Sequence, residues 1–319
     1  AVSVPSRIAA MDPTLIYSRY RDDAFAAQLT ATEYTVFVAM PFRNRFSYRA
    51  DDIYTGVIQT AAYKANALLD ADPGKCETRR FATPKRIDDQ PQTGRDIGGE
   101  IAKAILHAHA VVADLTFAND GVMLEVGAAL ALKPTNHIVL VTQGSASELH
   151  FDIKGNVIIE YSPKNGIYKI AEAMVAAVKD FEERRGEYLT QLSRELSRDA
   201  IWLMNWYGRL RTGQFWAENG QQVVSSLHEG VGVQAFLDPP HDITKARDSK
   251  KAEAMTRYQL AVRDLLAKRL IWTDYQAQTP KPGVDSFSNR GTRLGWMFLE
   301  HKWPGFTCPA DEFGSSTSP

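Results

Sequence analysis

The sequence predicts an α/β protein in which a parallel sheet carries helices on both faces, followed by a smaller, mostly helical domain. Short apolar runs at 36–38, 111–114 and 137–142 are typical of buried parallel strands. Amphipathic stretches alternate with these runs, which indicates parallel pairing of the strands. All six tryptophans lie beyond residue 200, so a second part with a different core follows.

The composition is that of a globular protein of two domains, with 319 residues, 44% hydrophobic and 24% charged. The net charge of −1 gives no overall field that would hold nucleic acid or anionic lipid, so such binding would have to be local. Cys76 and Cys308 match neither a disulfide framework nor a zinc module. The sequence has no membrane-spanning run and no signal-peptide pattern, so we expect a soluble, cytoplasmic protein without a membrane partner.

The α/β part is expected to alternate helices and strands after an appended helix at 11–29. The β-branched and aromatic run from Val36 to Val38 predicts a first strand that ends near Met40. The remaining expected elements are, in order, a helix over 51–69, a weaker strand over 76–82, a helix over 96–108, a strand over 109–115, a helix over 121–133, and strands over 137–142 and 156–161.

The domain boundary is expected inside a helical pattern that runs from about Ile167 toward Arg198, because the alternation of strand and helix stops there. Gly and Pro punctuate residues 212–249, which predicts a loop-rich stretch. The expected parts are an appended helix within 1–32, the α/β domain at 33–185, a second domain at 186–305 and a flexible tail at 306–319.

The second domain resembles a winged helix-turn-helix, because a helix over 257–271 precedes a hairpin-like stretch and a closing helix. Residues 247–271 include seven basic and three acidic residues. This excess of positive charge is small for binding duplex DNA. Tryptophans are frequent anchors of protein interfaces. We therefore expect this domain to mediate protein association, with DNA binding as the alternative.

Most well-known catalytic motifs are absent from the sequence. It has no phosphate-binding P-loop, no GxGxxG after the first strand, no HExxH and no GxSxG. His107 and His109 form an H-x-H pair where a helix meets a strand, and we expect two partly buried histidines there. No metal site is predicted.

The segment from 111 to 132 is the richest in chemistry. A buried strand ends in Asp114, and a loop with Asn119 and Asp120 leads into a helix, at the sheet edge where parallel α/β proteins bind ligands. Glu125 is expected in the first turn of that helix, where the helix dipole would keep its carboxylate ionised. A structural helix-terminus charge and a catalyst both fit this spacing.

Several ordered blocks together resemble the nucleoside 2-deoxyribosyltransferase-like superfamily. HFDIKGNVIIEY at 150–161 also resembles a segment of its bacterial TIR-like members. The resemblance spans residues 33–180 and implies a flavodoxin-like sheet with Glu125 as the nucleophile at the sugar anomeric carbon. The blocks are VFVAMPF at 36–42, RID at 86–88, VVADLT at 111–116 and LEVGAALAL at 124–132.

The resemblance also suggests roles for other residues. Asn119 stands six residues before Glu125, where the family has an acid that binds sugar hydroxyls. An amide can still bind a hydroxyl, so ribose should be accepted at least as well as deoxyribose. Asp88 matches an aspartate near the base or sugar and is a candidate general acid, with a turn residue as the alternative.

Other expected ligand contacts surround this edge. Phe42 is placed to stack on a nucleobase, although it could equally be a core residue. The arginines fit a phosphate group or simply a solvated loop. The remaining expected binding residues are Met40, Pro41, Arg43, Arg86, Asp114 and Asp120, with Arg45 and Arg49 as further phosphate candidates.

The resulting hypothesis is cleavage of, or transfer from, the N-glycosidic bond of a nucleoside, nucleotide or NAD by a homo-oligomer that needs no cofactor. The TIR-like resemblance implies a bacterial defence effector. A non-catalytic sensor of a nucleotide messenger and a DNA-binding regulator are the alternatives.

Overall fold

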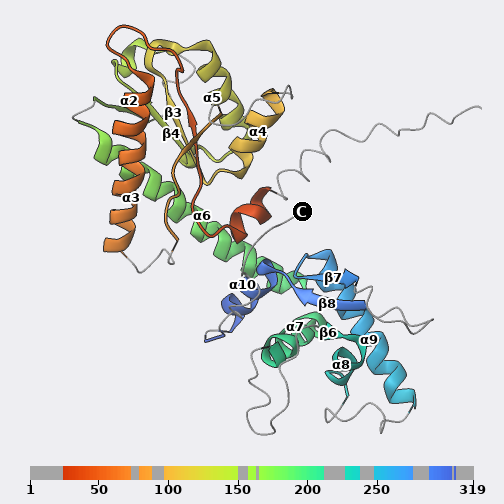
Figure 1. Ribbon diagram of the computed structural model, residues 1–319. Helices are drawn as coiled ribbons and strands as arrows, with labels where there is room; N and C mark the ends of the chain where they lie inside the picture. The colour runs from red at the N-terminus through yellow and green to blue at the C-terminus, as the bar shows by residue number, and fades with distance from the viewer. Residues whose placement is uncertain are drawn as a thin grey trace, which may run out of the picture. The chain divides into compact units, whose positions relative to one another are not determined.

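The computed structural model describes residues 24–72, 79–87, 97–149, 157–162, 165–211, 227–237, 248–275, 287–303 and 305–306 (Figure 1). The chain divides into two compact units, Ala1–Arg184 and Arg185–Pro319. The division falls inside the helix α6 (Ile167–Glu195), in the region where the sequence predicts a helical connector. Each unit has a sheet of its own.

The first unit is built on a parallel sheet with the order β2-β1-β3-β4-β5. The buried runs form its three central strands, because β-branched side chains pack well on both faces of a covered sheet. This order is that of flavodoxin-like doubly wound sheets. The strands are β1 (Val36–Ala39), β2 (Lys85–Arg86), β3 (Ala110–Asp114), β4 (Ile138–Thr142) and β5 (Ile158–Glu160).

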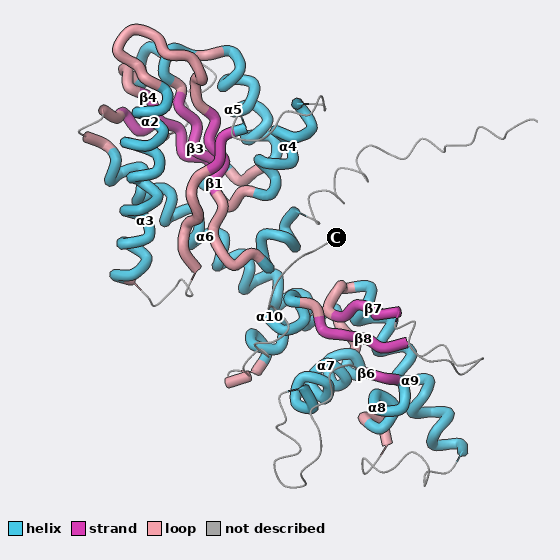
Figure 2. Tube along the Cα trace, viewed as in Figure 1, coloured by secondary structure: helices cyan, strands magenta, loops and turns pink. Residues whose placement is uncertain are grey.

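Helices cover both faces of this sheet, as the sequence predicts. Figure 2 shows α4 (Ile97–His107) and α5 (Asp120–Leu132) together on one face. On the other face lie α2 (Ala50–Ile53), a π-helical stretch η1 (Tyr54–Gln59) and α3 (Thr60–Ala71). Helix α6 lies beside α3, where Lys179 pairs with Asp72 at 2.6 Å.

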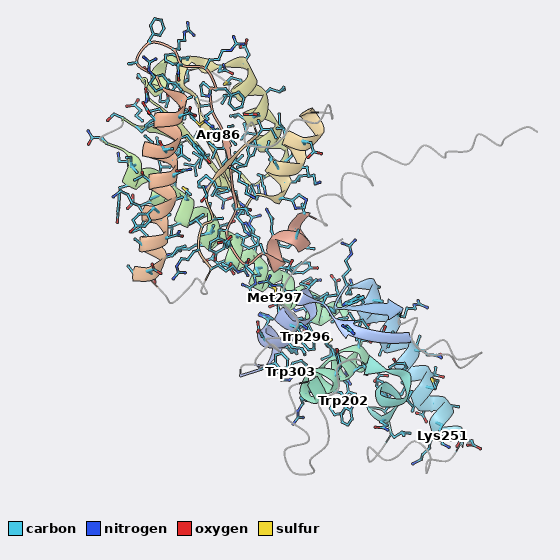
Figure 3. The ribbon with its side chains drawn as sticks, in the orientation of Figure 1. Arg86, Trp202, Lys251, Trp296, Met297 and Trp303 are labelled. Carbon is cyan, nitrogen blue, oxygen red and sulfur yellow. The ribbon has the colours of Figure 1, made fainter. Side chains whose placement is uncertain are left out.

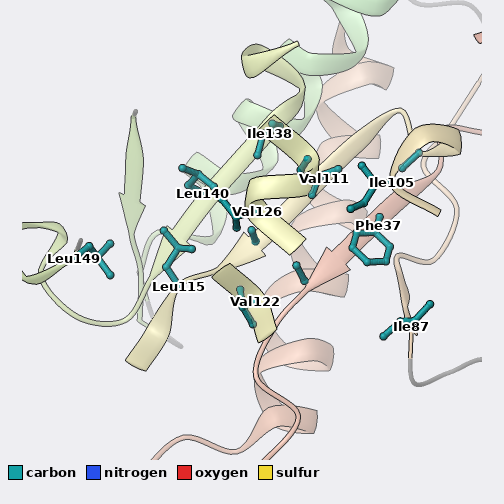
Figure 4. Close-up of a cluster of buried hydrophobic side chains, with 14 residues drawn as sticks. Phe37, Ile87, Ile105, Val111, Leu115, Val122, Val126, Ile138, Leu140 and Leu149 are labelled. Atoms are coloured by element: carbon teal, nitrogen blue, oxygen red, sulfur yellow. The ribbon is translucent and has the colours of Figure 1, made fainter. Parts of the chain in front are cut away.

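The core between the sheet and the α4–α5 layer is apolar. Phe37, Val111 and Leu140 of three neighbouring strands meet Ile105 and Val126 of the two helices (Figure 4). Burial of each such side chain contributes about 1.5–3 kcal/mol. This layer fixes α5, and hence the loop that precedes it, against β3.

Two expectations for the first unit are confirmed only in part. Of the strand expected over 76–82, Phe81 pairs in parallel with Tyr34, and residues 76–78 lie outside the described part of the chain. The edge strand itself is Lys85–Arg86. An edge strand needs only one partner, so two polar residues beside Phe37 and Val38 suffice. Residues 24–30 form a helix that packs on this unit through Gln28 and Phe25, whereas 11–23 are not described.

The H-x-H pair joins α4 to β3. His109 is fully buried: its Nδ1 accepts from the Thr35 amide at 3.0 Å, and its Nε2 donates to the Gln28 carbonyl at 3.1 Å. Burial lowers the pKa of His109 to about 3, so the ring is neutral. His107 is exposed rather than partly buried. Among the described residues, no cluster of histidine, cysteine and carboxylate side chains could hold a metal.

The second unit has an antiparallel sheet with the order β6-β8-β7. Trp296, labelled in Figure 3, and Trp206 lie in its core. Gly295 is needed because a Cβ there would lie 2.1 Å from the Leu270 carbonyl oxygen. Its elements are α7 (Arg198–Arg211), β6 (Leu227–His228), α8 (Glu229–Gln234), α9 (Asp248–Ala267), β7 (Ile271–Tyr275), β8 (Phe287–Gly291) and α10 (Arg293–Lys302).

The hairpin and the closing helix are present. The stretch expected to be loop-rich, 212–249, contains β6 and α8 among its described residues. The bounds expected for the helix over 257–271 are wrong, because α9 begins at Asp248 and ends at Ala267, and Ile271 opens β7. The first turn of α9 is polar and exposed, so it carries no apolar period that sequence could reveal. Of the expected tail, only Phe306 is described. None of the described helices combines the length and apolarity needed to cross a bilayer.

Candidate active site

The candidate site lies where the strand order reverses, between β1 and β3. These strands pair in register, with Val38 beside Val112 and Ala39 beside Ala113. The chain leaves β1 toward one face of the sheet and β3 toward the other. In doubly wound sheets, such a reversal forms the crevice at the carboxyl ends of the strands where ligands bind. The segments that follow Ala39 and Ala113 therefore share this edge.

Asp114 is a fully buried carboxylate at the end of β3. Its Oδ2 accepts from the hydroxyls of Tyr48, at 2.9 Å, and Tyr161, at 2.6 Å. Its Oδ1 accepts from the backbone amide of Thr116 at 3.1 Å and from the Thr116 hydroxyl at 2.5 Å. Burial raises the pKa of Asp114, and these four hydrogen bonds oppose the increase.

The cluster of Asp114, Tyr48, Tyr161 and Thr116, here called the Asp114 hub, joins the loops of the candidate site. Tyr48 follows β1, Thr116 follows β3 and Tyr161 follows β5. The Thr116 hydroxyl also accepts from the amide of Gln143, after β4, at 3.0 Å. Asp114 has no exposed surface, and its hydrogen bonds hold these loops together. The ligand contact expected of Asp114 stays a prediction.

Glu125 lies on the side of α5 that faces the core. Val122, Glu125, Val126 and Ala129 form the buried stripe of this helix, and Glu125 is 6% exposed. Because α5 begins at Asp120, Glu125 lies in its second turn rather than the first. The sequence argument from the helix dipole therefore applies to Asp120 instead, which is exposed.

Asn119 caps the amino terminus of α5. Its side-chain oxygen accepts from the amides of Gly121, at 3.0 Å, and Val122, at 3.3 Å. The oxygen is thus used by the helix, and no described residue accepts from the amide nitrogen of the side chain. The nitrogen is the part of Asn119 that could bind a sugar hydroxyl.

The remaining predicted residues are distributed around the same edge. Met40 and Pro41 are buried beneath it, while Phe42 is 49% exposed and Arg43 is exposed. Arg86, labelled in Figure 3, pairs with Asp51 at 3.0 Å, and its guanidinium lies 4.4 Å from the centre of the Tyr54 ring. Its charge also acts on Tyr48 and lowers the pKa of that hydroxyl, which burial raises more strongly. Asp88 lies outside the described residues.

Sequence reasoning missed Tyr48 and Tyr161. Tyr161 directly follows the last strand of the sheet, a position that could have marked it as a residue of this edge. Tyr48 lies in a loop with no periodic pattern, so no local signal links it to Asp114.

Comparison with known proteins yields no match to this chain, whether with family models, curated proteins or solved structures. The family resemblance of the sequence blocks therefore supports a proposal and identifies no family.

Proposed function

We propose that the first unit cleaves, or transfers from, the N-glycosidic bond of a nucleoside, nucleotide or NAD, with Glu125 as the nucleophile. The position of Glu125 carries this proposal. Its side chain is buried in the stripe of α5 that follows the loop from β3, beside the edge where ligands bind in such sheets. Carboxylates are seldom buried this deeply unless they have a specific partner or role.

The chemistry requires few groups. Cleavage passes through an oxocarbenium-like state, which a carboxylate facing the sugar stabilises. A Glu125 oxygen bonds to C1′ while the C–N bond breaks, and the electron pair leaves with the base nitrogen. Water or a second base then displaces the carboxylate. A nearby acid must protonate the leaving base, and Asp88 stays the candidate for that step.

The quoted sequence blocks support the same proposal, because they resemble a superfamily whose glutamate acts on this bond. In this proposal Asn119 and Asp120 lie near the sugar hydroxyls, and Phe42 stacks on the base. The proposed setting as a bacterial defence effector rests on the TIR-like resemblance alone.

The experiment is incubation of the full chain with a panel of nucleosides, nucleotides and NAD, with chromatography of the free base. We expect one class of compound to release its base. Saturable binding of a nucleotide without base release would favour the messenger sensor instead. Absence of both binding and release across the panel would contradict a nucleotide function altogether.

We further propose that the second unit is winged-helix-like and mediates homo-oligomerisation rather than DNA recognition. Its element order, helix, strand, two helices and a two-stranded hairpin, with β8 central in the sheet, supports the first part. Three basic side chains of the α9 region have acidic partners, which supports the second. These pairs are Arg257 with Asp199, Lys268 with Glu195 and Lys251 with Asp248.

A further inference from the structure

The segment from Arg43 to Arg49, here called the arginine loop, follows β1 at the edge of the candidate site. We propose that the arginine loop binds a phosphate group, so that the substrate is a phosphorylated nucleotide or dinucleotide rather than a nucleoside. The proposal rests on the proposed function for the sugar and the base. Phosphate binding itself can be measured without turnover.

Charge is the first observation. The arginine loop, RNRFSYR, has three arginines and no acidic residue, and Arg43, Arg45 and Arg49 are all exposed. No carboxylate of the described residues pairs with any of the three. Arginines elsewhere in this unit do have acidic partners, as in Arg80 with Asp70 and Arg184 with Asp180. Such a local concentration of exposed positive charge attracts anions.

The arginine loop is also held in place before any ligand binds. Arg45 and Tyr48 exchange two backbone hydrogen bonds, of 3.1 and 2.9 Å, which close a tight turn. The Asn44 side chain accepts from the amide of Ala50 at 3.0 Å and so fixes the start of α2. The Tyr48 hydroxyl anchors the turn to Asp114. Such a preformed loop loses little conformational entropy when it binds a ligand.

Arg45 lies over a pair of neighbouring phenylalanine rings. Its guanidinium carbon is 5.3 Å from the ring centres of both Phe46 and Phe117. The rings are 6.1 Å apart, and Phe46 is 77% and Phe117 41% exposed. Two aromatic rings within cation–π distance hold the guanidinium in place. A guanidinium positioned in this way can bind phosphate oxygens in pairs through its N–H groups.

Backbone strain at the same place supports a function. Phe46 and Phe117 have φ of 52° and 67°, and Ala118, next to the α5 cap, has φ of 44°. Non-glycine residues rarely adopt this region, and strained residues gather at ligand clamps. The two strained segments follow β1 and β3, the neighbouring strands that flank the crevice.

The surroundings favour a small anion over a nucleic acid. Asp51 and Asp52 are exposed in the first turn of α2, immediately after the arginine loop. An extended polyanion that followed the arginines would meet these two carboxylates. A single phosphate or a pyrophosphate is short enough to contact the arginines alone.

The test compares ligands that differ only in phosphate. Calorimetric titration uses adenosine, guanosine, cytidine and uridine, their 5′-monophosphates and NAD. Each ligand is titrated against the full chain carrying Glu125→Gln, so that no ligand is consumed. The same ligands are titrated against the wild-type chain in short runs. We expect a phosphate to raise affinity at least tenfold for the preferred base. Arg45→Gln should lower the affinity for the phosphorylated ligand about ten- to a hundredfold and leave the affinity for the nucleoside unchanged.

Two variants and a single-stranded oligonucleotide complete the test. Arg45→Lys keeps the charge but not the paired N–H donors of the guanidinium, and should retain part of the gain from the phosphate. Arg263→Gln removes an exposed arginine of α9 and should change nothing. Equal affinity for nucleoside and nucleotide, equal losses for Arg45→Gln and Arg263→Gln, or tighter binding of a single-stranded oligonucleotide would each overturn the proposal. Base release at the same rate with and without a phosphate on the ligand would overturn phosphate binding but support the proposed function. Phosphate-dependent binding without base release would support phosphate binding but contradict the proposed function.

Discussion

At the scale of single residues, Asp114 illustrates how burial changes the role of a side chain. Its position at a strand end suggests a ligand contact, yet its oxygens are occupied by the Tyr48, Tyr161 and Thr116 groups of three loops. Because a buried carboxylate needs such donors, the hub holds the loops in one arrangement. The arrangement includes the arginine loop, through Tyr48.

We predict that Tyr161→Phe and Tyr48→Phe each lower the free energy of unfolding by about 1–3 kcal/mol, because each removes a donor from a buried carboxylate. Both hydroxyls bind the same oxygen, Oδ2, so the double variant should depart from the sum of the single effects. Urea unfolding measures these changes. Tyr63→Phe, at an exposed position of α3, is the control, and losses no larger than in this control would refute the role of the hub.

His109 predicts a dependence of stability on pH. Its pKa is lowered to about 3 in the folded state, chiefly by burial, against about 6.5 in the unfolded chain. The unfolded state therefore binds the proton first as the pH falls, and the free energy of unfolding declines between about pH 6.5 and 3. Between pH 6.5 and 5, protonation of this single group should lower the free energy of unfolding by about 2 kcal/mol. The decline measured by denaturant unfolding should be smaller in His109→Asn by that amount, and an equal decline in both proteins would contradict the assignment.

At the scale of elements, the central strands are predictable because a fully buried apolar run has no other stable environment. The run expected at 109–115 is observed as Ala110–Asp114, and the one at 137–142 as Ile138–Thr142. The π-helical stretch and the two-residue strand β2 are not predictable, because neighbouring elements rather than local periodicity stabilise them. The start of α9 is not predictable because its first turn is polar and exposed and so has no apolar period.

The candidate site is predictable only in part. The strand end at Asp114 and the helix with Glu125 are adjacent in sequence, so a local motif reveals them. Tyr48 and Tyr161 join Asp114 from loops 66 and 47 residues away, and such contacts leave no local trace. The cation–π contact of Arg45 with Phe117 likewise forms only when the folded chain brings the two loops together.

The cap of α5 gives a prediction for a single element. Asn119→Ala should lower the free energy of unfolding by about 1 kcal/mol, because the amides of Gly121 and Val122 lose their acceptor. Asn119→Asp keeps an acceptor and should retain most of that stability. Thermal unfolding of the two variants beside the wild type would measure this. Equal destabilisation by alanine and aspartate would show that the cap does not stabilise α5.

At the scale of the whole molecule, the tryptophans have a mixed role. Trp206 and Trp296 are core residues, whereas Trp202 and Trp272 are each 45% exposed. The Trp202 indole donates to the Ala235 carbonyl, and Arg290 lies near the Trp272 ring. Among the described tryptophans, the candidates for interface anchors are therefore these two and the partly exposed Trp303.

We predict that residues 11–185 fold alone as a monomer, while the full chain forms an oligomer through the second unit. The division at residue 184 leaves the sheet and its core in the first part. Light scattering of both proteins measures the mass, and a duplex-DNA titration at about 150 mM salt tests the alternative. A monomeric full chain that binds a specific duplex at nanomolar concentration would favour the DNA-binding regulator.

Glu125→Gln is the most direct test of the account, because the amide keeps the shape of the side chain but cannot attack C1′. The full-length variant should keep its fold and its ligand affinity while base release falls by several orders of magnitude. Glu172→Gln, at an exposed position of α6, is the matched control and should release base at the wild-type rate. Base release by folded Glu125→Gln at the rate of the wild type would contradict the central claim.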